Sequence, residues 1–298
     1  MLFENLIDEW LQKGLQRYTS RTQIDYKKLS KYYLELHGLY LSEIDDRLLL
    51  RFFIRLSVGR KYKTVRNILS GLSSFFDYCI CEGYTEVNPC INHTLTTRLR
   101  SHFRTALDKM KKQKHAINEH EAIMLLGGAY AISFEFGLAV EFLICTGMRL
   151  GELAALRPAD VKHFVMLNKN VNEITKEVQL SCKWGSNGKV ELPPPLYLKY
   201  LEYEKTNKEE WAFPYVRFYQ KQFSKRLGRL SDRLNITHTT AHTLRRTALT
   251  WLASDGHSMA VVQRIARHTS VRMTEAYIDG RFVPLSGVTE SISRRLYK

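Results

Sequence analysis

The sequence predicts a mainly α-helical fold with a small β-sheet or hairpin in its second half (α+β), divided into two domains. Three observations carry this prediction. The chain has 298 residues, more than one compact core usually needs. Apolar residues recur at helical spacing through the first ninety residues, and residues 177–192 change to the alternation that is typical of strands. We expect a first domain over 1–92, a linker over 93–115 and a second domain over 116–298.

The first domain is expected to consist of successive amphipathic helices. Hydroxyl residues at 18–22 supply caps before the second helix, and Ser42 is expected to start the third. Gly83 and Asn88-Pro89 close the unit. The apolar stripes run over residues 2–11, 26–36, 48–56 and 69–79.

The bulk charge is the most informative property of the composition. Lys and Arg number 45 against 30 Asp and Glu, a net charge of +15, which favours a polyanionic partner with nucleic acid as the first candidate. An anionic membrane surface is the weaker alternative, because no basic amphipathic anchor is present. No stretch approaches the roughly 18 apolar residues that cross a bilayer, and the acidic N-terminus does not resemble a signal peptide. We therefore expect a protein that stays inside the cell.

A basic segment marks the boundary between the domains. Asp108 is its one acidic residue. The segment is either a solvated linker or a strap that crosses phosphate groups. Its basic residues are Arg98, Arg100, Arg104, Lys109, Lys111, Lys112 and Lys114.

The second domain is expected to begin with helices over 119–126 and 136–156. The alternation of residues 177–192 around Gly185-Ser186-Asn187-Gly188 predicts a β-hairpin with its turn at 185–188. Further helices are expected at 196–203, at 219–234, at 242–253 before Gly256, and after a Ser258 cap.

Cysteine and histidine spacing does not indicate a metal site. The five cysteines lack the paired spacing of zinc ligands, and we interpret them as reduced thiols. His238 and His242 are four residues apart, but no third ligand and no Glu of an H-E-x-x-H pattern accompany them.

Two short motifs hold candidate chemistry. Arg149 and Glu152 are three residues apart in Thr146-Gly147-Met148-Arg149-Leu150-Gly151-Glu152-Leu153, so we expect them on one helix face. An ordinary ion pair explains this spacing equally well, but the preceding apolar run makes a charge there costly without a role. His242 and Arg245 repeat the spacing, and an imidazole beside a fixed cation suits proton transfer near a phosphate.

His268 is followed nine residues later by Tyr277. Each candidate residue alone has an ordinary explanation: Tyr277, one of the 16 tyrosines of the chain, could be a half-buried tyrosine that serves only packing. In order, the T-G-x-R-x-x-E-L box, H-x-L-R, and the final His and Tyr resemble the tyrosine recombinases, the family of Cre, the Xer proteins and phage-type integrases. Two positions depart from the family pattern: Ala266-Arg267 replaces the usual Leu-Gly, and Arg246 replaces a common His.

The resemblance implies a two-domain, C-shaped DNA clamp, the tyrosine recombinase catalytic fold, in a site-specific DNA recombinase of integrase or resolvase type. Tyr277 would form a 3′-phosphotyrosyl link without cofactor, Arg149 and Arg245 would bind the phosphate, and His242 would move the proton. His268 would donate to the phosphate, and Glu152 would orient Arg149. The hairpin would supply a lysine general acid, for which we prefer Lys183 over Lys189.

The resemblance also implies double-stranded DNA with a simple, core-type inverted-repeat site as the partner, bound by a homotetramer that is a monomer or dimer when free. A tail helix from about 285 would dock on a neighbouring subunit or in cis. The enzyme would work in the cytoplasm, associated with the nucleoid, and would belong to a mobile element or a host. A type IB topoisomerase-like enzyme and a non-catalytic DNA-binding regulator remain alternatives. Candidate DNA contacts are Arg60, Lys61, Lys63, Arg66, Arg98, Arg100, Arg104, Arg217, Lys221, Lys225, Arg226 and Arg229.

Overall fold

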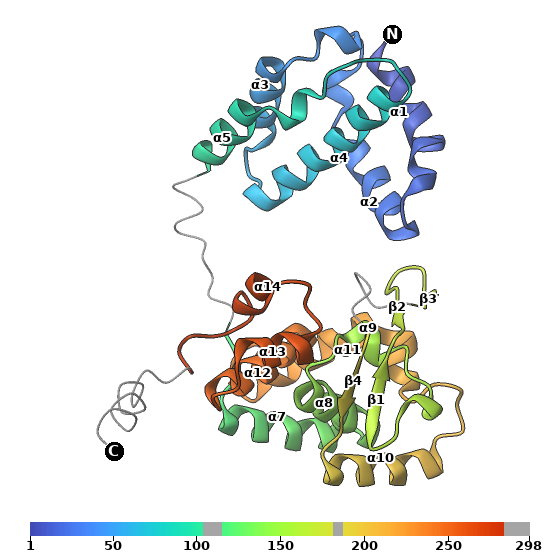
Figure 1. Cartoon of the computed structure of the whole chain (residues 1–298), viewed down its shortest axis with the longest axis vertical. Helices are drawn as coiled ribbons and strands as arrows, with labels where there is room; N and C mark the ends of the chain where they lie inside the picture. Colours follow the sequence, from blue (N-terminus) through green and yellow to red (C-terminus); the bar gives the residue numbers. More distant parts are fainter. Residues whose placement is uncertain (104–114, 181–186, 283–298) are drawn as a thin grey trace. The chain divides into compact units, whose positions relative to one another are not determined.

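The computed structural model describes residues 1–103, 115–180 and 187–282, and is mainly α-helical with small antiparallel sheets, as expected (Figure 1). The chain divides into two compact units, Met1–Lys112 and Gln113–Lys298. Each unit has its own apolar core. Among the described helices, none combines the length and apolar character that a bilayer span requires.

The first unit is built around one long helix, α4, whose apolar face carries Leu72, Phe75 and Phe76. Trp10 of α1 and Tyr33 pack into the same core, which excludes water from both rings. Its helices are α1 (Phe3–Gln12), α2 (Ser20–Ser30), α3 (Asp46–Leu56), α4 (Tyr62–Cys81) and α5 (His93–His102).

Local capping chemistry corrects two expected helix boundaries in this unit. The third helix begins after Asp45, whose Oδ1 accepts from the Leu48 amide at 2.7 Å, and Ser42 lies in a short 3₁₀ turn instead. The first residues of the expected linker form α5, which buries Leu95 and Leu99. These ten residues therefore pack with the first unit.

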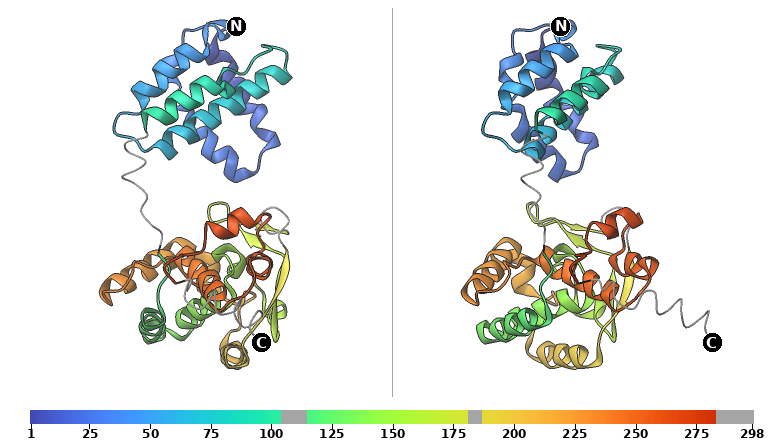
Figure 2. Two further views of the ribbon diagram at one scale, coloured as in Figure 1. Left: turned by 60° about the vertical axis from the view of Figure 1, so that its left-hand side comes forward. Right: turned by 90° about the vertical axis from the view of Figure 1, so that its left-hand side faces the viewer.

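In the second unit the other helices pack around α8 (Figure 2). This helix is apolar on nearly all sides and contacts α7, α10 and α12. A helix with this pattern belongs in the centre of a core. The helices are α7 (Glu119–Ile132), α8 (Phe134–Thr146), α9 (Leu150–Leu153), α10 (Pro194–Thr206), α11 (Pro214–Arg233), α12 (Ala241–Ser254), α13 (Met259–Ala266) and α14 (Val271–Glu275).

The predicted hairpin over 177–192 is wrong in its pairing. Strand β4 (Gly188–Glu191) pairs antiparallel with β1 (Phe164–Leu167), and β3 (Val178–Gln179) pairs with β2 (Asn170–Val171). The strands therefore reverse at residues 172–177 and not at 185–188. There, Asn172 Oδ1 accepts from the Ile174 amide at 3.0 Å, an Asx-type turn.

The hydrophobic pattern of β1 explains why the sequence does not predict this strand. In β1, Val165 and Leu167 are buried, but Met166 between them is apolar and 40% exposed. The segment Phe-Val-Met-Leu therefore lacks the apolar–polar alternation that identifies a half-buried strand. Neighbouring residues 181–186, which include the predicted Lys183 and Cys182, lie outside the described residues.

Candidate functional site

The phenol of Tyr277 lies against the first turn of α12. Its oxygen is 2.9 Å from Nε2 of His242, which is exposed, and the two rings meet edge to face. Thr240 caps α12 by accepting from the Thr243 amide at 3.2 Å, which fixes the turn that carries His242. A tyrosine and an exposed imidazole in hydrogen-bond contact can transfer a proton between them.

Arg245, three residues after His242, is completely buried although it carries a charge. Its guanidinium donates to the carbonyls of Gly147 and Ala266, both at 2.5 Å. It also lies 5.7 Å from the centre of the Tyr277 ring. Gly147 ends α8 with φ of +59°, a conformation that favours glycine, and this turn presents its carbonyl to Arg245.

Arg149 and Glu152 are in contact, as expected, but they do not share a helix face. The expected helix over 136–156 breaks at Gly147, and Arg149 is the N-cap of α9. Glu152 Oε2 accepts from the Arg149 amide at 2.8 Å, and Oε1 accepts from its guanidinium at 2.7 Å. The carboxylate thus fixes both the backbone and the side chain of Arg149.

Arg267 is a second cation on Glu152, in addition to Arg149, and sequence reasoning missed it. Its Nη2 donates to Glu152 Oε2 at 2.6 Å, and its φ of +54° places an arginine where glycine is favoured. Burial would raise the pKa of Glu152, but the charges of Arg267 and Arg149 hold it below its usual value. The signal was the Ala266-Arg267 departure from the family pattern.

His268 is buried between Arg245 and Thr274. Burial, followed by the charges of Arg245 and Arg149, lowers the pKa of His268 to about 4, so the ring is neutral at pH 7. Arginine can only donate, so His268 Nε2 accepts from Arg245 Nη2 at 3.0 Å. The proton is then on Nδ1, which donates to Thr274 Oγ1 at 3.1 Å. Both ring nitrogens are thus engaged, in contrast to the expected donation to a phosphate.

The guanidinium groups of Arg149, Arg245 and Arg267 are close enough to interact electrostatically, and Arg245 lies beside the Tyr277 ring. Burial, followed by the charge of Arg149, lowers the pKa of Arg245 to about 10, which leaves Arg245 charged at pH 7. Such fixed guanidinium groups suit the oxygens of a phosphate. The described residues contain no group of three or more His, Cys, Asp or Glu side chains that could hold a metal ion.

The structure describes one of the two predicted lysines. Lys183 lies outside the described residues. Lys189 is exposed on β4, with Nζ 3.9 Å from the centre of the Phe164 ring. A Cβ on the preceding Gly188 would stand 2.8 Å from Arg267 Cδ, so the start of β4 lies directly against the site.

Among the described residues predicted to contact DNA, one is buried and the others are exposed. Arg217 is buried and donates to the Lys176 carbonyl at 2.8 Å, so its assignment as a surface DNA contact is wrong. Arg60 is exposed, but its Nη1 donates to the Leu56 carbonyl at 2.7 Å. Arg104 lies outside the described residues. The other exposed residues are Lys61, Lys63, Arg66, Arg98, Arg100, Lys221, Lys225, Arg226 and Arg229.

Comparison with known proteins connects this arrangement to one family. Residues 111–282 match the phage integrase family. The chain is similar to a tyrosine recombinase XerC-like protein of Caldanaerobacter subterraneus subsp. tengcongensis, with 25% identity over 282 residues that cover 80% of this chain and 68% of that protein.

Two solved structures share the fold. The Tn1549 transposon integrase in complex with a circular intermediate DNA has a TM-score of 0.77 at 17% identity, covering 97% of this chain and 98% of that chain. A lambda integrase tetramer bound to a Holliday junction has a TM-score of 0.68 at 17% identity, covering 94% of this chain and 78% of that chain.

Proposed function

The chain belongs to the phage integrase family of tyrosine recombinases, enzymes that cleave and rejoin DNA, and we propose that Tyr277 is the nucleophile of this reaction. The observation that carries the proposal is the 2.9 Å contact between the Tyr277 phenol and His242, beside the buried Arg245. This arrangement joins a nucleophile, a proton acceptor and a fixed cation.

In the proposed reaction the Tyr277 oxygen attacks the scissile phosphorus. The new bond joins the tyrosine oxygen to phosphorus, and the bond to the 5′-oxygen of the next nucleotide breaks. His242 assists removal of the phenol proton. The product is a 3′-phosphotyrosyl link, which preserves the ester for rejoining when a 5′-hydroxyl attacks it. No energy source or metal is needed in this sequence of steps.

Arg149 and Arg245 are proposed to stabilise the charge that develops on the phosphate oxygens. Arg245 is preorganised by two carbonyls, and Arg149 by Glu152. Because His268 accepts from Arg245 in this structure, we assign His268 first to orienting that guanidinium. Glu152 acts through Arg149 without reacting itself.

The departing 5′-oxygen requires a proton, which we propose comes from Lys183, with Lys189 as the alternative. A lysine near the start of β4 is supported by Gly188, because this residue lies against Arg267 of the site.

The proposed substrate is duplex DNA with a core-type inverted-repeat site, bound by four copies of the chain. The lambda integrase tetramer, which shares the fold, supports this assembly. The exposed cations on α4, α5 and α11 are proposed to bind backbone phosphates, and the C-shaped clamp remains part of this proposal. We also propose a cytoplasmic, nucleoid-associated enzyme.

Tyr277→Phe tests the proposal on a nicked suicide substrate, on which loss of the short 5′-hydroxyl strand traps the covalent adduct. Wild-type protein should form the adduct, and Tyr277→Phe should not, while its affinity for DNA stays unchanged. Tyr197→Phe, at a half-buried tyrosine on α10, is the matched control and should form the adduct.

Persistence of the adduct in Tyr277→Phe would contradict the assignment of the nucleophile. Recombination between two sites, assayed beside relaxation of supercoiled DNA, separates a recombinase from a topoisomerase-like enzyme. An adduct-free wild type that still binds DNA would indicate a non-catalytic regulator.

A further inference from the structure

One stripe of α12 faces the chain segment that carries Tyr277. His242, Arg246 and Thr250 are spaced four residues apart and therefore lie on one side of the helix. His242 contacts the phenol oxygen, and the next two residues of the stripe contact the backbone behind it. One rigid helix thus holds both ends of the same tyrosine.

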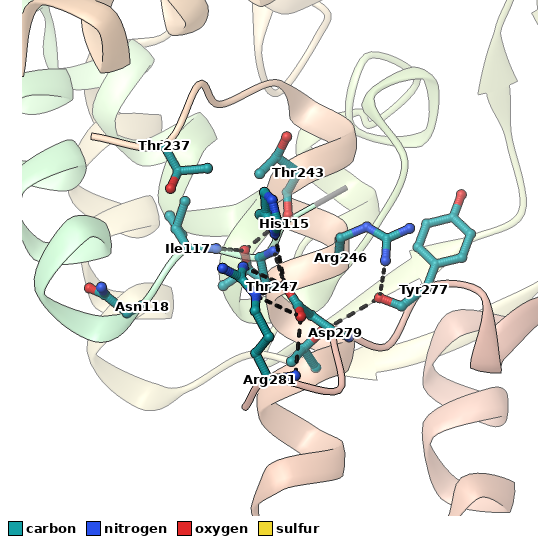
Figure 3. A network of polar contacts seen from close by, with 12 residues as sticks. His115, Ile117, Asn118, Thr237, Thr243, Arg246, Thr247, Tyr277, Asp279 and Arg281 are labelled. Carbon is teal, nitrogen blue, oxygen red and sulfur yellow. Dashed lines mark hydrogen bonds and ion pairs between the residues drawn. The ribbon is translucent and has the colours of Figure 1, made fainter. Parts of the chain in front are cut away.

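Arg246 makes the central contacts of this stripe (Figure 3). Its Nη1 donates to the Tyr277 carbonyl at 2.9 Å, and its Nη2 donates to the Ala276 carbonyl at 2.8 Å. Its guanidinium carbon also lies 5.4 Å from the centre of the Tyr277 ring. Ala276 ends the five-residue helix α14, whose last carbonyls need donors and favour a cation.

The chain after Tyr277 is anchored to the same helix. The Asp279 amide donates to Thr250 Oγ1 at 3.0 Å, and Asp279 Oδ2 accepts from the Ala116 amide at 3.0 Å. Thr247, also on α12, accepts from the Ile117 amide at 3.1 Å. Of these residues, Figure 3 labels Ile117, Thr247 and Asp279, which lie near one another beside α12. These contacts anchor residues 116, 117 and 279, whereas the Tyr277 carbonyl is bound by the side chains of Arg246 and Thr250.

Without Arg246, the Tyr277 carbonyl would keep one weak side-chain partner among the described residues, Thr250 Oγ1 at 3.5 Å. A bond at that distance is at the limit of hydrogen-bond geometry. The tyrosine would then be held mainly by α14, a helix of five residues that is little more than one turn long. A displacement of about 1 Å at a reacting group can cost about 100-fold in rate.

We propose that Arg246 is a positioning residue that holds the Tyr277 backbone so that the phenol reaches the phosphate beside His242 and Arg245 of its own subunit. The proposal rests on the proposed function of Tyr277 as nucleophile. Both terminal nitrogens of Arg246 are engaged by the two carbonyls, which assigns it to the tyrosine and not to the phosphate.

The first test measures adduct formation on the suicide substrate at saturating DNA. Arg246→Ala should lower the maximal rate by about 100-fold, while its dissociation constant for DNA stays within twofold of wild type. Arg246→Lys should recover part of the rate, because an ammonium group still donates to a carbonyl. Arg264→Ala removes an exposed arginine of α13 and serves as the matched control. Thermal unfolding of each full-length variant identifies loss of folding, and in that case Arg246→Lys alone carries the test.

A second test separates positioning from a direct role at the phosphate. In a Tyr277→Phe background, hydrogen peroxide supplies an external nucleophile, and release of the 5′-hydroxyl strand is measured with and without Arg246→Ala. Positioning predicts that the added Arg246→Ala leaves this release unchanged. An equal loss of peroxide cleavage, or a wild-type adduct rate in Arg246→Ala, would overturn the inference. Absence of any adduct in wild type would instead overturn the proposed function.

Discussion

Glu152 and Arg267 form an ion pair at 2.6 Å although 115 residues separate them in the sequence. Their side chains are 1% and 3% exposed. The other carboxylate oxygen binds Arg149 at 2.7 Å. One buried carboxylate therefore links Arg149 at the start of α9 to Arg267 at the end of α13.

Glu152→Ala should lower the free energy of unfolding by about 3–5 kcal/mol, because it leaves two arginines without their buried counter-charge. Glu152→Gln should cost less, since its amide oxygen can still accept from one arginine. Urea denaturation of the full chain measures both. Glu202→Ala, at an exposed glutamate on α10, should change stability by about 0.5 kcal/mol or less. A loss below about 1 kcal/mol in Glu152→Ala would show that the buried pair is not needed for stability.

The neutral state of His268 predicts a specific pH dependence of stability. Its pKa is lowered to about 4, so between this value and about 6.5 the unfolded chain binds a proton that the folded chain does not. Stability from this group is complete above pH 6.5 and is lost as the pH falls toward 4. Between pH 7 and pH 5 the expected loss is about 2 kcal/mol.

Chemical denaturation of wild type and His268→Gln at pH 7, 6 and 5 measures this contribution. The other histidines are common to both proteins, so their titration cancels in the difference. The stability advantage of wild type over His268→Gln should shrink by about 2 kcal/mol as the pH falls. A difference that stays constant with pH would mean that His268 titrates normally in the folded chain.

The lysine general acid can be identified with a modified leaving group. A 5′-bridging phosphorothiolate departs without a proton, so it should restore cleavage to the variant that lacks the acid. We expect rescue of Lys183→Ala, and we expect Lys189→Ala to cleave normal and modified substrates at similar rates. Rescue of Lys189→Ala alone would transfer the role to Lys189 on β4.

Salt dependence tests the proposed phosphate contacts of the first unit. Lys63 and Arg66 are exposed on α4. Each alanine substitution should weaken DNA binding and reduce the slope of log K against log salt by about one. Lys13→Ala, at a lysine paired with Glu9 on α1, should leave the slope unchanged. Equal slopes in all three variants would remove Lys63 and Arg66 from the interface.

Local signals in the sequence predicted much of the helical structure and the members of the site. Thr19 and Ser258 cap α2 and α13 as expected, because a cap depends only on residues within one turn. Six of the residues predicted for the catalytic site also lie together: Arg149, Glu152, His242, Arg245, His268 and Tyr277.

Long-range pairing was the part that the sequence did not reveal. The choice of β1 as the partner of β4 depends on a strand whose exposed residue, Met166, is apolar. The sequence pattern marks Arg267 only as a departure from the family, because its partner Glu152 is remote in the sequence. Arg246 likewise acquires its contacts only when α14 folds against α12.

Peptide mapping of the trapped covalent adduct is the most direct measurement of the central claim. Wild-type protein is trapped on the nicked substrate, digested with protease and nuclease, and analysed by mass spectrometry. The expected result is a nucleotide joined through its 3′-phosphate to Tyr277. A nucleotide on any other residue, or a link through a 5′-phosphate, would contradict the account.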